Sequence, residues 1–111
     1  MAVDPGLLDL MRGDLADLQG IREVRMFGGL CFMREGHMLC GLHKGGAMYR
    51  VGKASIDKAL AIPGASPMAF TGRTMGGLID VDADGMADDK SRAAWLKMAC
   101  DFTDSLPPKL R

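Results

Sequence analysis

The sequence predicts an α+β domain: one antiparallel sheet of five or six strands with helices packed on one face. Two observations support this prediction. Apolar residues recur at helical spacing near both ends of the chain, whereas the middle holds short apolar runs separated by glycine-containing turns. The expected order is helix, three or four strands, helix, two strands, helix, and segregated strands and helices of this kind pack as two layers. At 111 residues, we expect a single domain over 1–111.

The first helix is expected to follow Asp4, which can cap it, with Pro5 in its first turn. Its apolar residues form one stripe: Leu7, Leu8, Met11, Leu15 and Leu18. Gly20 is the expected terminator of this helix.

A meander of antiparallel strands is expected next, over residues 22–27, 29–33, 38–43 and 47–51. Glu35-Gly36 suits a two-residue hairpin turn because glycine tolerates positive φ. The first two segments are either separate strands or one long strand bent at Gly28-Gly29. We favour the bend, since it lets Phe27 and Leu30 both reach the core.

The second half of the chain returns to helical periodicity twice. A helix is expected over 53–62, with Ile56, Ala59 and Leu60 facing inward, and Pro63-Gly64 ends it. Two strands are expected near 67–70 and 75–81. The last helix is expected over about 88–105. Its buried stripe is expected to hold Trp95, Met98, Ala99, Phe102 and Leu106.

The composition is that of a soluble globular protein, with 48% hydrophobic and 25% charged residues. The sequence shows no signal peptide and no apolar run of the roughly 20 residues that a membrane helix needs, so we expect a cytoplasmic protein with no membrane contact. The 14 basic and 14 acidic residues cancel. Because this balance removes the general attraction to polyanions, we expect no direct contact with nucleic acid.

The run Arg25-Met26-Phe27-Gly28-Gly29 resembles the signature of the TfoX N-terminal domain family, also called the TfoX/Sxy family. The later segments Met48-Tyr49-Arg50-Val51, 70–75, 94–95 and 106–109 resemble further landmarks of the family in the same order, so the similarity covers nearly the whole chain. The chain is most similar to the short stand-alone branch, because longer members carry a second, helical domain.

The resemblance to this family implies a fold like that of secretion chaperones, with a curved antiparallel sheet. It also implies a regulatory role, since the longer members act as co-regulators of competence genes alongside the catabolite activator protein. The family has no known catalytic residues, and the resemblance therefore implies none for this chain.

The cysteines carry the most specific chemical hypothesis. If Glu35-Gly36 is a two-residue turn, strict pairing places Cys31 opposite Cys40, close to the distance that a disulfide needs. Met33 and Met38 would share their face, and soft sulfur ligands suit Cu(I) or a redox switch. The alternative, which we favour, is that these residues fill the core.

Two acidic or glycine-rich runs imitate known sites. Residues 80–85 match the first half of a calcium-binding EF-hand loop, but the twelfth loop position is Ser91 where a bidentate glutamate is required. We expect these acids to lie on a solvated strand end, with Asp88 or Asp89 capping the last helix. Gly52-Lys53 lacks the glycines of a phosphate loop, and we discard it.

These observations together predict a non-enzymatic regulatory module that binds a partner protein, either an unknown one or a second copy of the chain. Ten methionines support an adaptable binding surface. We expect no cofactor, metal or catalytic residue. The candidate contact or family-motif residues are Arg25, Met26, Phe27, Gly28, Gly29, Tyr49 and Arg50. The alternative function is a redox or soft-metal sensor that uses Cys31 and Cys40.

Overall fold

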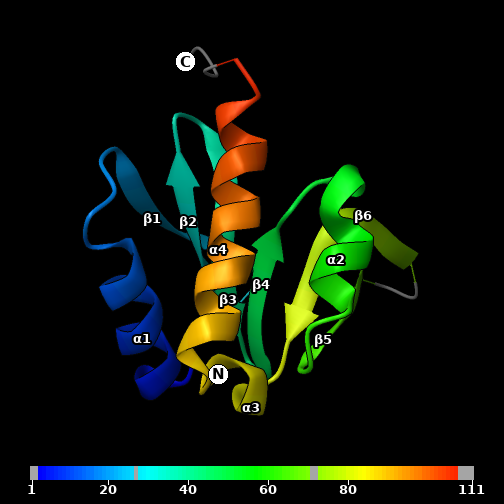
Figure 1. Cartoon of the computed structure of the whole chain (residues 1–111). Coiled ribbons are helices and arrows are strands. Elements are labelled where there is room, and N and C mark those ends of the chain that lie inside the picture. Colours follow the sequence, from blue (N-terminus) through cyan, green and yellow to red (C-terminus); the bar gives the residue numbers. More distant parts are fainter. Residues whose placement is uncertain (1–2, 27, 71–72, 108–111) are drawn as a thin grey trace.

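A six-stranded antiparallel sheet carries its helices on one face, as the computed structural model of the chain shows (Figure 1). The structure describes residues 3–26, 28–70 and 73–107. Within them lie the strands β1 (Ile21–Met26), β2 (Gly29–Arg34), β3 (His37–His43), β4 (Gly46–Arg50), β5 (Ala65–Phe70) and β6 (Arg73–Val81). The helical elements are α1 (Pro5–Leu15), the 3-10 turn η1 (Lys53–Ser55), α2 (Ile56–Leu60), α3 (Ala83–Met86) and α4 (Asp89–Asp104). The predicted α+β class is confirmed.

The strand order β1-β2-β3-β4-β6-β5 joins a four-stranded meander to a second hairpin. The bent long strand expected around Gly28-Gly29 is wrong. Instead, β1 and β2 pair as a hairpin whose last partners are Met26 and Gly29. Gly28 takes a φ of 76°, and tight hairpin turns require such positive values. Phe27 lies outside the described residues.

The first helix begins as predicted. The Asp4 carboxylate accepts hydrogen bonds from the backbone N–H groups of Gly6 (2.8 Å) and Leu7 (3.4 Å), and Pro5 starts the helix. The helix ends at Leu15, five residues before the expected terminator Gly20. Its buried residues are Leu7, Met11 and Leu15.

The acidic run that imitates a calcium loop caps helices instead. Asp82 precedes α3, a short helix that was not predicted from the sequence, and its Oδ1 accepts from the N–H of Gly85 at 2.7 Å. Asp88 caps α4 by accepting from the N–H of Ser91 at 2.9 Å, as predicted. These carboxylates therefore satisfy helix N-termini, where their charge is also favoured by the helix dipole.

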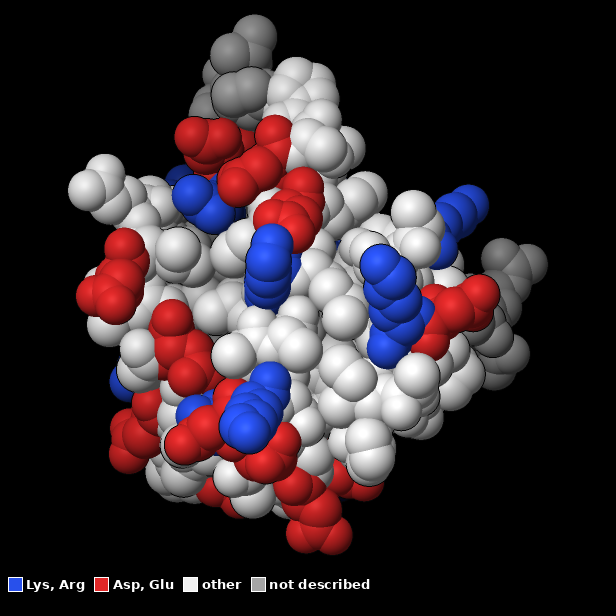
Figure 2. Space-filling view, in the orientation of Figure 1, with Lys and Arg blue, Asp and Glu red and all other residues white. Residues whose placement is uncertain are grey.

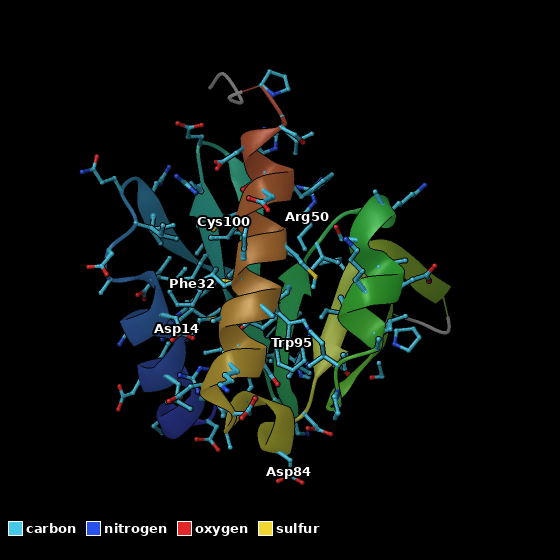
Figure 3. All side chains as sticks on the ribbon, in the orientation of Figure 1. Asp14, Phe32, Arg50, Asp84, Trp95 and Cys100 are labelled. Atoms are coloured by element: carbon cyan, nitrogen blue, oxygen red, sulfur yellow. The ribbon has the colours of Figure 1, made fainter. Side chains whose placement is uncertain are left out.

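The main core lies between the sheet and the helices, and each helix contributes to it: Leu7 from α1, Ala59 from α2, Met86 from α3 and Trp95 from α4. Trp95 is fully buried, and its indole N–H donates to the carbonyl of Ala59 at 3.2 Å. Figure 3 shows this side chain beside α4, on the side that faces α2. The predicted helical stripe therefore centres on Trp95 and Ala99.

Acidic side chains gather toward the end of the molecule formed by α1, α3 and the start of α4 (Figure 2). The exposed members include Asp9, Asp17, Asp84, Asp88 and Asp89. In the described residues, none of the helices combines the length and the apolar character needed to cross a membrane.

Candidate functional site

The sheet face opposite the helices carries a second apolar cluster, which we call the methionine face. Its buried centre is Cys31, Met48 and Met68, exposed by 1%, 7% and 5%. Met33, Met38 and Leu78 are half-buried and pack against this centre. All six residues come from strands β2 to β6, and no helix of the described chain contributes to the cluster.

Alternation along the strands produces this second apolar face. In β4, Ala47 and Tyr49 join the main core while Met48 between them joins the methionine face. In β6, Ile79 joins the main core, whereas its neighbour Leu78 joins the methionine face. Antiparallel sheets with helices on one side usually alternate apolar and polar residues, with the polar residues facing water. The central strands here are apolar on both faces.

Gly41 makes room for this cluster at the middle of β3. A Cβ atom at this position would lie 2.8 Å from Cε of Met48 and 2.7 Å from the carbonyl oxygen of Leu30. The missing side chain therefore lets Met48 lie flat across β3. Met68 and Leu78 were not among the site residues predicted from the sequence; for Leu78, the available signal was its place next to Ile79 in an apolar strand, where neighbouring side chains point to opposite faces.

Both histidine rings are held by hydrogen bonds, two for His43 and one for His37. His43 Nδ1 accepts from the N–H of Gly45 at 3.0 Å, so Nε2 carries the proton and donates to Asp80 at 2.6 Å. His37 Nε2 lies 2.6 Å from the carbonyl oxygen of Pro107 and must donate to it. Because both ring nitrogens of His43 are engaged, this residue has no free lone pair for general-base chemistry.

The expected cross-strand pairing of Cys31 with Cys40 is wrong. A β-bulge adds Leu39 to β3, so Phe32 pairs with Cys40 and Cys31 pairs with Gly41. This one-residue change turns the thiols to opposite faces: Cys40 lies in the main core and Cys31 in the methionine face.

The environment of the thiols also argues against redox chemistry. Burial raises the pKa of Cys31, and burial raises the pKa of Cys40 well above its ordinary value. A raised pKa lowers the thiolate fraction, which is the reactive form. Within residues 3–26, 28–70 and 73–107, no group of three or more His, Cys, Asp or Glu side chains is arranged to hold a metal ion.

The family-signature segment lies at the β1–β2 turn. Arg25 is exposed and lines a cavity of about 420 Å³ together with Gly28, Gly29 and residues of α1. Position 29 requires glycine because β3 passes close to its Cα: a Cβ atom there would lie 2.2 Å from the carbonyl oxygen of Leu42. The side chains of Met26 and Phe27 lie outside the described part of the structure.

Tyr49 and Arg50 are adjacent in sequence but differ in environment. Tyr49 is 1% exposed, its hydroxyl donates to Sδ of Met86 at 3.6 Å, and burial raises its pKa. Its expected role as a contact residue is therefore wrong; it packs against Trp95 with ring centroids 5.9 Å apart. Arg50 is half-buried and lies over the ring of Phe102, 5.2 Å from the centroid.

Comparison with known protein families gives a match over most of the chain. The profile of the TfoX N-terminal domain family matches residues 14–103, which span the chain from within α1 to near the end of α4. No curated protein and no solved structure matches the chain. The matched region includes the β1–β2 turn, the methionine face and most of the main core. The chain therefore belongs to the TfoX N-terminal domain family.

Proposed function

We propose that this protein is a small, non-enzymatic regulatory module that binds a partner protein through the methionine face. The observation that carries the proposal is the apolar character of a sheet face that no described helix covers. Apolar surface left without a second layer is typical of an interaction site, because its burial stabilises a complex.

The chemistry of this face suits an adaptable contact. Its half-buried rim holds Met33, Met38 and Leu78. Methionine side chains are flexible and polarisable, so they can repack against partners of different shape. The buried centre with Cys31 and Met48 gives the rim a rigid support.

Membership of the TfoX N-terminal domain family supports the regulatory part of the proposal. Longer members of the family, which carry a second domain, act as co-regulators of competence genes. Regulation of this kind takes place in the cytoplasm. We place this module in the same kind of process, as a domain that acts by contact and leaves the chemistry to its partner.

Site-specific photo-crosslinking tests the proposed face. A photoreactive residue at position 38, on the rim, is expected to capture a partner protein in living cells, whereas one at the exposed position 58 of α2 is expected to capture none. The double variant Met33→Lys, Leu78→Lys, made with the photoreactive residue still at position 38, should abolish that capture, because it places two charges in the interface.

Three outcomes would count against the proposal. Equal capture from positions 38 and 58 would show that the face is not specific, and capture that survives the double variant would show that the rim is not the contact. If the protein crosslinked only to itself, the face would bind a second copy of the chain and not a different partner protein. Circular dichroism of the double variant must match that of the parent protein.

A further inference from the structure

A second cavity, of about 560 Å³, lies on the helix side of the sheet between the end of β4, η1 and the C-terminal half of α4. The residues that give it its character are Arg50, Lys53, Met98, Asp101, Phe102 and Ser105. Figure 3 shows Arg50 beside α4 on the side that faces α2, and Figure 2 shows mostly uncharged surface between these helices. The cavity is separate from the methionine face.

Glycines shape this cavity. A Cβ atom on Gly52 would lie 2.4 Å from Cδ1 of Phe102, so the aromatic ring occupies the place of the missing side chain. A Cβ atom on Gly76 would lie 3.0 Å from Cε of Lys53, so the Lys53 stem runs across the bare backbone of β6. The ring forms one wall and the lysine stem forms another.

The cavity holds more positive than negative charge that is available to a ligand. Among the described residues, no carboxylate lies within 4.0 Å of the charged groups of Arg50 or Lys53. Asp101 also lines the cavity, but its carboxylate accepts from Nζ of Lys97 at 2.9 Å. The Arg50 guanidinium uses one face on the Phe102 ring, which leaves its N–H edge for hydrogen bonds.

The backbone amides of two residues at the cavity are already engaged within the protein. The N–H groups of Val51 and Gly52 both donate to the carbonyl oxygen of Gly77, at 2.9 and 3.0 Å. A phosphate-loop cradle needs such groups to point at the ligand. The groups that we assign to recognition are the two cationic side chains and the apolar wall of Phe102 and Met98.

We propose that this cavity binds a small amphiphilic anion, with an acidic head held by Arg50 and Lys53 and an apolar body against Phe102 and Met98. The volume falls within the roughly 300–1,000 Å³ of small-molecule sites. Arginine forms paired hydrogen bonds with both carboxylate and phosphate, and the arrangement accepts either head group. Binding here does not depend on the partner contact proposed above, because it uses the other side of the sheet.

Amide NMR titration of the ¹⁵N-labelled protein tests the site with four probes: hexanoate, hexyl phosphate, hexanol and inorganic phosphate. The two amphiphilic anions are expected to shift the amides of Gly52, Lys53, Gly76 and Gly77, and the stronger of the two identifies the preferred head group. Hexanol and inorganic phosphate should each bind at least about tenfold more weakly, since each lacks one half of the recognised structure.

Variants assign the binding to the two cations. Arg50→Gln and Lys53→Gln are each expected to weaken the binding of the more tightly bound anion by about tenfold, because each variant removes one charge-assisted contact. Lys58→Gln, which removes an exposed lysine of α2 outside the cavity, should leave the affinity unchanged. If Arg50→Gln fails to fold, Lys53→Gln carries the test, because Lys53 is exposed.

The proposal is overturned if hexanol binds as tightly as the anions, because the cavity is then only apolar. It is equally overturned if inorganic phosphate matches them, or if Lys53→Gln keeps full affinity. Shifts that centre on Met38 and Met48 would place the probes on the methionine face and would also overturn it.

Discussion

Glycines without room for a side chain set how closely the central strands approach. A Cβ atom on Gly29 would lie 2.2 Å from the carbonyl oxygen of Leu42, and one on Gly41 would lie 2.7 Å from the carbonyl oxygen of Leu30. Both contacts are with backbone, which cannot rotate away as a side chain can. Alanine at either position would therefore force β2 and β3 apart.

The change Gly29→Ala is predicted to lower the free energy of unfolding by about 2–4 kcal/mol, through strain in a buried strand pair. Gly13→Ala is the matched control. Gly13 lies inside α1 with no atom within 4 Å of an added Cβ, so this change should raise stability by about 0.5–1 kcal/mol. Urea denaturation followed by circular dichroism measures both; equal effects of the two changes would refute the close approach at Gly29.

Among the elements, α1 and α4 are joined by a buried arginine. Arg92 is 6% exposed, and its guanidinium donates to Asp14 of α1 at 2.8 and 3.3 Å and to the carbonyl oxygen of Met86 at 2.8 Å. Asp89 pairs with it from the exposed side. This network fixes α1 against the start of α4, and Asp14 and Arg92 lie 78 positions apart in the chain.

Asp14→Ala is predicted to destabilise the protein by about 2–3 kcal/mol, because it leaves a buried cation short of its main partner. The exposed pair Lys97–Asp101 supplies the control. Asp101→Ala should cost much less than Asp14→Ala, as is usual for a solvated pair one helical turn apart. Thermal denaturation of both variants gives the comparison, and a loss at Asp14 no larger than at Asp101 would mean that Arg92 finds other partners.

At the scale of the whole molecule, buried ionisable groups link stability to alkaline pH. Burial raises the pKa of Cys40 well above its ordinary value of 9.0, and burial also raises the pKa of Tyr49 above 10.0. The folded protein therefore keeps protons that the unfolded chain loses at high pH. Stability is at its full value below about pH 9 and falls as the pH rises further.

The free energy of unfolding is predicted to fall between pH 9 and pH 10.5, with Cys40 contributing on the order of 1 kcal/mol per pH unit. Cys40→Ala should reduce this slope, although the cavity it creates lowers stability at every pH. Cys100→Ala, at a partly exposed position of α4, should keep most of the slope. Urea titrations across this range provide the measurement; identical slopes for the parent and Cys40→Ala would exclude Cys40 as the titrating group.

The sequence by itself determined the α+β class, the strand segments and the helix caps. These features depend on local properties: the spacing of apolar residues, the turn at Glu35-Gly36, and carboxylates at Asp4 and Asp88 that satisfy nearby N–H groups. The family could also be identified from short motifs in order. Each of these signals involves residues close together in the chain.

Only the tertiary structure decided which residues share a site. The bulge at Leu39 shifted the register by one residue and separated Cys31 from Cys40, since side chains alternate between the two faces of a strand. The cavity brings Arg50 to Phe102 across half the chain, and no local pattern encodes that contact. Local forces thus specify the elements, whereas packing and register specify the surfaces through which this protein can act.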